Sequence, residues 1–202
     1  SSSAFREMFG YAINFQINGI AQLLFEPTTK ALLSKFGGLS SVAYYEMANR
    51  MIMQIRSLLV AANQVVVPVV ASLLEKDPSR VPAAYRRCYE VMFYLSVPAY
   101  SLILLAIPAI SELWVGRYEF LFVTFSFILT ACWFFNTLAS PAYFSYAGIG
   151  RLRWNTLSHL LMGACNVLFG YIFATMWGGI GVVSGTACAL LVGSVVPIAA
   201  FH

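Results

Sequence analysis

The chain has 202 residues, of which 60% are hydrophobic and only 10% are charged, and its formal net charge is +4. This composition leaves too little polar surface for a soluble globule and predicts an all-α membrane protein. The basic residues form no long run and no aromatic-interleaved patch, so we expect no nucleic-acid partner. The four cysteines show neither CxxC nor Cys/His ligand spacing, so we interpret them as core-filling residues and expect no metal.

The apolar segments predict a single six-helix transmembrane bundle occupying residues 1–202, with short loops and no folded soluble domain. The chain lacks an initiator Met and a leader, and it stops directly after an apolar helix, so we expect it to be part of a longer protein. The predicted spans cover residues about 9–36, 42–74, 83–110, 119–146, 155–177 and 180–201.

The first predicted span carries a polar stripe that drifts slowly around the helix. Its polar residues stand four apart, at Asn14, Asn18, Gln22, Glu26 and Lys30. Successive members are displaced by ~40° at 3.6 residues per turn. The proline that follows Glu26 removes a backbone hydrogen bond, so we expect a kink there, and the glycine pair at 37–38 should end the helix.

The second predicted span divides into two faces. It is longer than the ~30 Å hydrocarbon core requires, so it should tilt or project into water, and Pro68 should bend its far end. Because the chain as a whole is so apolar, we expect the polar face to turn away from lipid. That face carries Glu46, Asn49, Arg50, Gln54, Arg56, Ser57, Asn63, Gln64 and Ser72.

The remaining spans contain isolated polar residues and one ridge of small residues. Asn136 lies inside the fourth span and His159 in the fifth, where we interpret the histidine as a packing or hydrogen-bonding residue rather than a proton relay. In the last span, small residues recur every four positions and should allow close helix packing. They are Gly181, Gly185, Ala189 and Gly193.

Basic residues are unevenly divided between the two ends of the predicted bundle, and this bias predicts its orientation. The end with few basic residues has Lys35 and Arg117, with Lys30 near the same interface. We therefore place both ends of the chain in the cytoplasm of a multi-pass protein. The end with many basic residues is the one that we place in the cytoplasm. It carries Arg6, Lys76, Arg80, Arg86, Arg87, Arg151 and Arg153.

No catalytic motif or phosphate-binding glycine loop is present, so we do not expect an enzyme. The notable feature is intramembrane charge, Glu26 on the first span and Arg50 and Arg56 on the second. A lone charge there costs at least ~2.5 kcal/mol, so it normally pairs or faces water. Arg50 could form a structural ion pair with Glu26 or Glu46, whereas Arg56 has no acid one turn away on its own helix.

Guanidiniums and amides on one face suit an anionic, hydroxyl-rich ligand, because arginine forks match phosphate and amides serve sugar hydroxyls. Glu26 is the candidate for coupling to an ion. The predicted cavity-lining residues are Arg50, Arg56, Gln54, Asn49, Asn63, Asn18 and Gln22.

The run from Phe36 to Asp77 resembles the second half of bacterial polysaccharide-export flippases, a resemblance that extends over nearly the whole chain. In that family a glycine-rich turn precedes a Val/Gly-x-Tyr-Tyr-x-x-Ala-x-Arg pattern and a proline before a charged loop. The matching residues here are Gly37-Gly38, Val42, Tyr44-Tyr45, Ala48, Arg50 and Pro68. The segment 178–190, GGIGVVSGTACAL, resembles the family's penultimate turn and the last helix of the bundle.

The resemblance implies one lobe of a MATE-like fold, shared with multidrug and toxic-compound extrusion transporters and the peptidoglycan-precursor flippase. The other bundle, expected upstream, would face this one across a central cavity. The implied function is flipping of undecaprenyl-pyrophosphate-linked oligosaccharide across the bacterial inner membrane, with Arg50 and Arg56 in the cavity. The resemblance also implies that the glycan polymerisation and export machinery is a partner of this protein. Transport could be coupled to H⁺ or Na⁺, and no cofactor is expected.

Two other functions stay open. A cation-coupled drug antiporter of the same fold would use Glu26 for the ion and Phe134 and Phe135 for the drug, but the excess of intramembrane arginines favours an anionic substrate. A membrane scaffold for glycan-assembly enzymes would not need the polar face of the second span.

Overall fold

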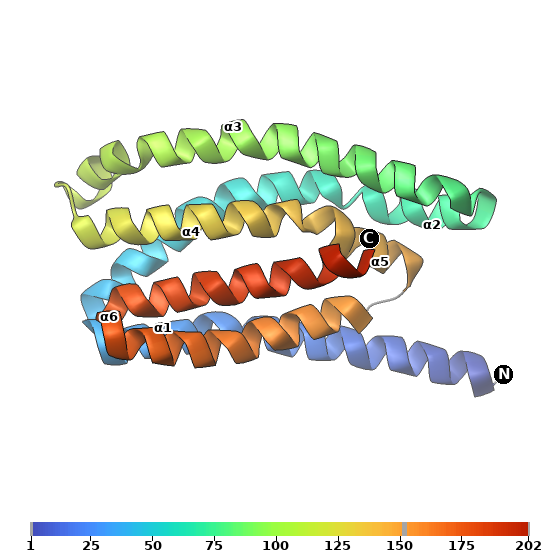
Figure 1. The fold of residues 1–202 in the computed structure, drawn as a ribbon, viewed down its shortest axis with the longest axis horizontal. Coiled ribbons are helices and arrows are strands. Elements are labelled where there is room, and N and C mark those ends of the chain that lie inside the picture. Colours follow the sequence, from blue (N-terminus) through green and yellow to red (C-terminus); the bar gives the residue numbers. More distant parts are fainter. Residues whose placement is uncertain (1, 151–152, 202) are drawn as a thin grey trace.

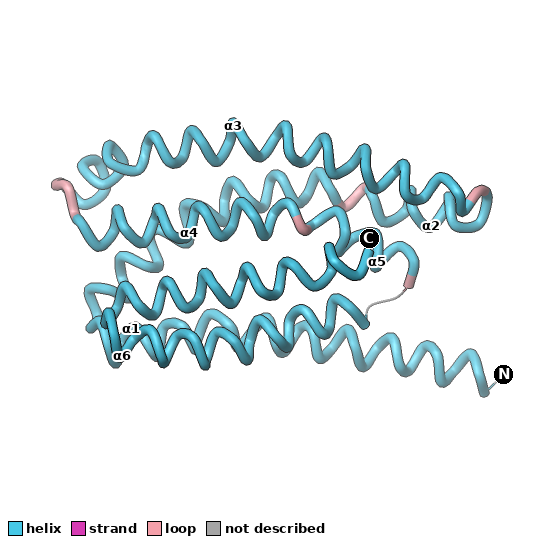
Figure 2. Tube along the Cα trace, viewed as in Figure 1, coloured by secondary structure: helices cyan, strands magenta, loops and turns pink. Residues whose placement is uncertain are grey.

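The computed structural model describes residues 2–150 and 153–201, with side chains at residues 16, 25–150 and 153–199. Every long element is an α-helix, and the helices lie roughly parallel along the long axis of the molecule (Figures 1 and 2). The elements are α1 (Ser2–Asn63), α2 (Val66–Lys76), the 3-10 turn η1 (Pro78–Arg80), α3 (Val81–Val115), α4 (Phe120–Leu138), α5 (Ser140–Ile149) and α6 (Arg153–Phe201).

Helices α1 and α6 each contain a sharp reversal at a glycine. Gly38 has φ 78° and ψ 172°, and Gly178 has φ 57° and ψ −133°. Residues other than glycine rarely adopt these backbone conformations. The ribbon doubles back at both places, at the same end of the molecule (Figure 1). The two turns also touch, because a Cβ on Gly37 would lie 3.0 Å from the Cα of Gly179.

Two further breaks have a proline as their cause. Pro68 cannot donate a hydrogen bond to the carbonyl of Gln64. The helix is interrupted at residues 64–65, where α1 has ended and α2 has not begun, close to the bend predicted at Pro68. Pro141 likewise leaves the carbonyl of Thr137 without its helical donor, and the hydroxyl of Ser140 donates to that carbonyl at 2.6 Å instead. Residues 119–146, predicted as one helix, are therefore divided into α4 and α5.

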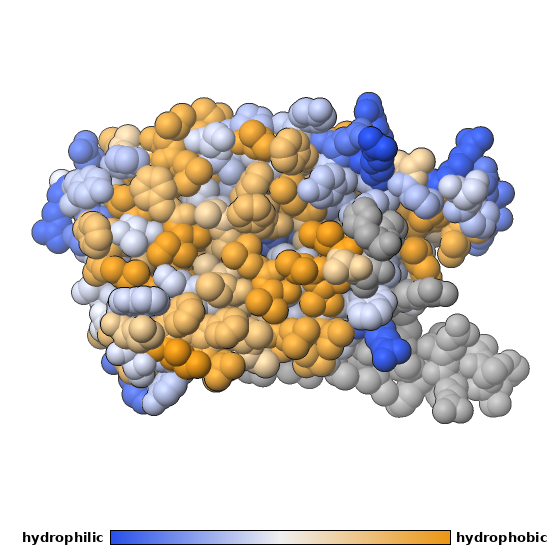
Figure 3. Space-filling model, viewed as in Figure 1, coloured by the Kyte–Doolittle hydropathy of each residue, from blue (hydrophilic) through white to orange (hydrophobic). Residues whose placement is uncertain are grey.

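The described residues contain four helical segments that are long and apolar enough to cross a membrane, rather than the six predicted. They are 25–76, 78–115, 120–149 and 153–199. The first and the last of them include the reversals at Gly38 and Gly178, so the number of crossings remains a prediction. Apolar residues cover the middle of the visible face and hydrophilic residues gather at both ends, as expected for a chain that crosses a lipid bilayer (Figure 3).

The described side chains form two separate hydrophobic clusters between the helices. The larger joins α1, α3, α4 and α6, with Leu33, Ile52 and Phe125 fully buried. The smaller centres on Val66 and Val70 of α2 and packs against α3 and α5. The cavity described below lies beside α5, near the junction of the two clusters.

The predicted ridge of small residues is confirmed. A Cβ on Gly185 would lie 2.6 Å from the backbone nitrogen of Gly170, and one on Gly193 would lie 2.9 Å from the Cβ of Met162. These glycines let the second half of α6 pack closely against the first half.

The described ends of the chain lie at one end of the bundle, together with the α2–α3 connection (Figure 1). The α3–α4 loop and both glycine reversals lie at the opposite end. This arrangement agrees with the distribution of basic residues along the sequence. The two ends that the sequence analysis distinguishes are therefore the two ends of the folded bundle.

Candidate functional site

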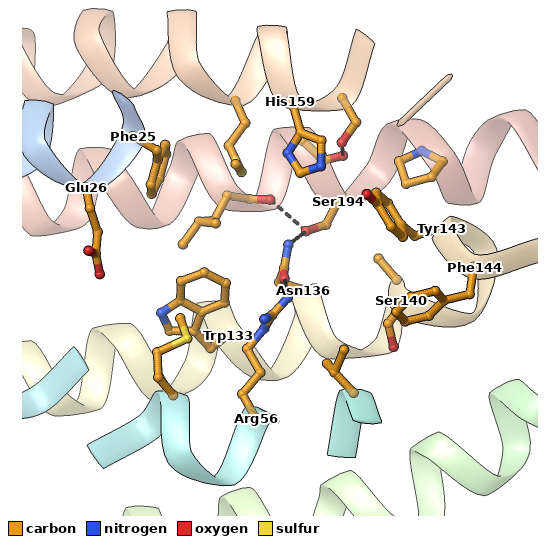
Figure 4. A pocket seen from close by; sticks show the side chains of 18 of the residues that line it. Phe25, Glu26, Arg56, Trp133, Asn136, Ser140, Tyr143, Phe144, His159 and Ser194 are labelled. Carbon is orange, nitrogen blue, oxygen red and sulfur yellow. Dashed lines mark hydrogen bonds between the residues drawn. The ribbon is translucent and has the colours of Figure 1, made fainter. Parts of the chain in front are cut away.

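A cavity of about 520 Å³ opens between α1, α4, α5 and α6. Side chains from all four helices converge on it (Figure 4). The part of its wall that the structure describes combines one cation and one carboxylate with amides, hydroxyls and aromatic rings, a mixture typical of ligand sites. Its polar and aromatic lining comprises Phe25, Glu26, Tyr45, Arg56, Trp133, Asn136, Ser140, Tyr143, Phe144, Ser158, His159 and Ser194.

Arg56 is the cation of this cavity. Its Nη2 donates to Oδ1 of Asn136 at 2.8 Å, and its guanidinium carbon lies 4.7 Å from the centre of the Trp133 ring. Its Nε is buried, and no group among the described residues accepts a hydrogen bond from it. Within the part of the chain that the structure describes, Arg56 also forms no ion pair. A neutral amide and a ring face therefore compensate a largely desolvated cation only in part.

The partner of Arg56 on α4 is itself held in place. Asn136 uses Nδ2 to donate to the hydroxyl of Ser194 at 2.9 Å, and that hydroxyl donates to the Leu190 carbonyl at 2.7 Å (Figure 4). These bonds fix the Asn136 amide so that its oxygen faces the guanidinium. Arg56 on α1 is thus connected through α4 to α6.

Glu26 belongs to a cluster of charges at one edge of the cavity. Lys30 Nζ lies 3.5 Å from Oε2 of Glu26 and also contacts Oε1 of Glu46, which lies beyond the Gly38 reversal. Asn49 Nδ2 donates to Oε1 of Glu26 at 2.7 Å. Because the Glu26 side chain is 49% exposed, these contacts remain partly screened by solvent.

The ion pair considered for Arg50 does not form. Glu26 and Lys30 are four residues apart and share one helix face, so the lysine reaches the carboxylate without crossing between helices. The same lysine also forms an ion pair with Glu46, the second acid considered for Arg50. Arg50 is exposed and has no ion pair among the described residues.

The structure brings some of the predicted cavity residues together and leaves others apart. Arg56 and Glu26 line the cavity. Asn49 is buried just behind it, and Asn63 is buried where it donates to Ser140 Oγ at 2.8 Å. Gln54, like Arg50, is exposed and is not among the residues that line this cavity. The side chains of Asn18 and Gln22 lie outside the described residues.

Several residues at the site were missed by sequence reasoning. Trp133 was not singled out, and Asn136 was noted only as a polar residue in an apolar helix. Ser194 was not noted, and His159 was interpreted as a packing or hydrogen-bonding residue. Both line the cavity, where the His159 ring lies 5.7 Å from that of Tyr143. No spacing in the sequence connects α4 to α6, so only the folded chain shows that these residues meet.

The aromatic pair suggested for drug binding lies elsewhere. Phe134 packs edge-on against Tyr100 at 5.7 Å, and Phe135 is 52% exposed. Neither residue lines the cavity.

A buried polar cluster fixes the helix that carries Glu26. Asn166 of α6 donates to Thr29 Oγ1 at 3.0 Å and to the Phe25 carbonyl at 3.2 Å, and Thr186 donates to Asn166 Oδ1 at 2.9 Å. The three side chains are fully buried and satisfied by one another. They anchor α1 to both halves of α6 beside Pro27, where the proline lacks a backbone donor.

The fold is that of several solved transporter and flippase structures. The chain superposes on MATE in the straight conformation with a TM-score of 0.82 and 16% identity, covering 98% of this chain and 46% of the other. For the lipid II flippase MurJ in an inward closed conformation the TM-score is 0.73 at 15% identity, with coverages of 94% and 41%. A MOP superfamily transporter from Pyrococcus furiosus Vc1 gives 0.78 at 16% identity, with coverages of 97% and 44%.

The chain spans less than half the length of these proteins. A sequence comparison with curated proteins gave no significant match. The family model described as polysaccharide biosynthesis protein matches residues 1–118, more than half of the chain.

The apolar helices and this fold define the chain as a multi-pass membrane protein with the fold of MATE and MurJ. By the match over residues 1–118, it belongs to the polysaccharide biosynthesis protein family.

Proposed function

We propose that this protein flips undecaprenyl-pyrophosphate-linked oligosaccharide from the cytoplasmic to the outer leaflet of the bacterial inner membrane. The single observation that carries the proposal is Arg56, a cation on a cavity wall that is compensated, among the described side chains, only by an amide and a ring face. An anionic group entering the cavity would supply the missing counter-charge. Family membership in polysaccharide biosynthesis and the likeness of the fold to MurJ support this choice of substrate.

The cavity suits one part of such a substrate. Its volume of about 520 Å³ lies in the range of ligand pockets and is far smaller than a whole lipid-linked glycan. We therefore assign it the pyrophosphate and the adjoining sugar, with the prenyl chain in lipid. The arginine fork binds phosphate oxygens, and the amides and hydroxyls face the sugar.

The chain acts in this proposal as one six-crossing lobe of a two-lobed transporter. The reversals at Gly38 and Gly178 would each divide one long apolar segment into two crossings, raising four segments to six. Less than half of each structural neighbour is covered, which leaves room for a second lobe. The lobes would rock between inward-open and outward-open states. Both ends of this segment would be cytoplasmic, beside the glycan polymerisation and export machinery.

The proposal is tested by complementation of a flippase-null strain, with surface-glycan export and membrane abundance measured together. Arg56→Ala should abolish export at normal abundance, and Arg56→Lys should retain part of it, because lysine keeps the charge but loses the fork. Arg50→Ala is the matched control, since it removes an exposed arginine from the same helix. Full export by Arg56→Ala would contradict the proposal.

A cation-coupled drug antiporter is the second candidate, and one observation favours it. Glu26 lines the same cavity as Arg56, so a cationic drug or a coupling H⁺ or Na⁺ could meet a carboxylate there. Glu26→Gln should then abolish drug resistance, whereas Arg56→Ala should leave it intact. Glycan export that requires Arg56 would decide against this candidate.

A further inference from the structure

We propose that Asn49 and Trp133 are positioning residues that link the charge of Glu26 to the guanidinium of Arg56. The inference rests on the proposed role of Arg56 as the anion-binding residue and adds a means of controlling it. While Glu26 is ionised, the link holds Arg56 against the Trp133 ring. When Glu26 is neutralised, the link weakens and Arg56 becomes available to an anionic ligand.

The link is a continuous series of contacts across the helices. Asn49 donates through Nδ2 to Glu26 Oε1 at 2.7 Å and accepts through Oδ1 from Trp133 Nε1 at 3.2 Å. The face of the same Trp133 ring carries the Arg56 guanidinium at 4.7 Å. One buried amide thus joins the first half of α1 to α4, and the indole joins α4 to the second half of α1.

The contacts are arranged so that charge at one end is felt at the other. An ionised carboxylate polarises the amide that donates to it, and the Asn49 oxygen then becomes a better acceptor for the indole N–H. An indole whose N–H donates to a stronger acceptor has more electron density on its face, where it attracts the Arg56 cation. Each step is electrostatic. The Asn49 amide in the middle of the series is shielded from water, because only 4% of that residue is exposed, whereas the Glu26 end is partly solvated.

Neither Asn49 nor Trp133 is needed to neutralise Glu26. Lys30 already lies beside that carboxylate and also contacts Glu46. The Asn49 amide is therefore an additional connection, directed from the charge cluster toward the cavity. Lys30 and Glu46 are also the charged groups whose direct field must be separated from any effect transmitted through Asn49.

The consequence is a coupling between two events in the proposed transport cycle. A proton or a monovalent cation bound at Glu26 would cancel its charge and loosen Arg56 from the ring. The loosened guanidinium would turn its fork toward a phosphate in the cavity. An anion that occupies Arg56 would by reciprocity favour the neutralised form of Glu26.

The test uses the complete protein in detergent and farnesyl pyrophosphate as the probe, with affinity measured by isothermal titration calorimetry. Glu26→Gln removes the charge but keeps a carbonyl oxygen that can accept from Asn49. Trp133→Phe keeps a ring under Arg56 and removes the N–H, and Asn49→Leu interrupts the link at its other bond. Gel filtration and thermal unfolding show which variants are folded.

We expect Glu26→Gln to raise the affinity about fivefold or more, as for typical coupled sites. In the Trp133→Phe and Asn49→Leu backgrounds the same change should raise affinity less than about twofold. Glu46→Gln is the matched control, because it removes one negative charge from the same Lys30 cluster without a bond to Asn49. It should also change affinity less than about twofold.

Two results would overturn the link. One is an equal rise with Glu46→Gln, and the other is an undiminished rise with Glu26→Gln in both interrupted backgrounds, since each means that charge acts directly through space. A different result identifies failure of the proposed function itself. If Arg56→Ala binds farnesyl pyrophosphate as tightly as the unaltered protein, Arg56 is not the anion-binding residue.

Discussion

Asn63 donates a hydrogen bond of 2.8 Å to the hydroxyl of Ser140 and thereby connects the break between α1 and α2 to the break between α4 and α5. The same hydroxyl donates to the Thr137 carbonyl at 2.6 Å, the group that Pro141 leaves without a helical donor. One buried pair therefore bridges two interruptions that have prolines as their cause. We infer that it sets how α2 and α5 lie relative to the rest of the bundle.

Replacing Asn63 by Leu should lower stability because this bond is lost in a buried setting. The expected loss is about 1 kcal/mol, the typical net contribution of one hydrogen bond. Thermal unfolding of the purified protein in detergent measures it. Gln64→Ala, at the exposed neighbouring position, should have little effect, and equal losses at both positions would show that the Asn63–Ser140 bond contributes nothing specific.

Glycine-to-alanine changes at two helical positions should have opposite outcomes. A Cβ on Gly148 would lie 2.8 Å from the Val67 carbonyl oxygen and 3.0 Å from Val70 Cβ, so Gly148→Ala must push α5 away from α2 at a cost of about 1–3 kcal/mol. At Gly163 no described atom outside the adjoining residues and its own helical turn lies within 4 Å of the added Cβ. Helix propensity should therefore make Gly163→Ala neutral or stabilising by up to about 1 kcal/mol. Unfolding midpoints of the two variants check this, and a destabilised Gly163→Ala with an unaffected Gly148→Ala would contradict the packing described.

Lys30 should matter more than Arg50 for the charge cluster. Lys30→Met leaves Glu26 and Glu46 facing each other without their shared cation, so membrane abundance should fall. The effect should be modest, within about 1 kcal/mol, because these side chains are 31–49% exposed. Adding Glu46→Gln should restore much of the abundance, whereas Arg50→Met alone should leave it unchanged. Quantitative immunoblots of membrane fractions measure all three, and absence of rescue would show that repulsion between the acids is not the cause.

The orientation across the membrane can be tested by labelling. In a background without Cys88, Cys132, Cys165 and Cys188, single cysteines at positions 38 and 80 are treated with an impermeant thiol reagent from outside. The distribution of basic residues predicts labelling at 38 and protection at 80. Labelling at 80 alone would reverse the orientation and place the Glu26–Lys30 cluster on the cytoplasmic side.

Much of the fold could be predicted because the signals for membrane helices and their ends lie within short stretches of sequence. Apolar length, the glycine pairs and Pro68 each act within one segment, and the structure places helices and breaks where those signals stand. The small-residue ridge was also predictable, since a four-residue period is a property of one helix. Pro141 was overlooked because its segment read as one continuous apolar helix, although the same argument applies to it as to Pro68.

The cavity was only partly predictable, because its residues meet through tertiary packing. The two-faced pattern identified Arg56 and the polar stripe identified Glu26, and both line the cavity. The pattern could not separate Arg56 from Arg50 and Gln54, which are exposed, because a wide polar face includes directions into and out of the bundle. Nor could it show that Trp133 would hold Arg56, since that contact joins residues 77 positions apart on α1 and α4.

The most direct test of the account is transbilayer movement of the proposed substrate. The complete protein is reconstituted into liposomes with a fluorescent undecaprenyl-pyrophosphate-linked oligosaccharide, and its accessibility to a membrane-impermeant quencher is followed over time. The account predicts movement that depends on the protein, is abolished by Arg56→Ala, is partly retained by Arg56→Lys and is unaffected by Arg50→Ala. The account would be contradicted if Arg56→Ala moved the lipid at the rate of the unaltered protein. It would also be contradicted if the unaltered protein moved no lipid in liposomes in which it exports a cationic drug.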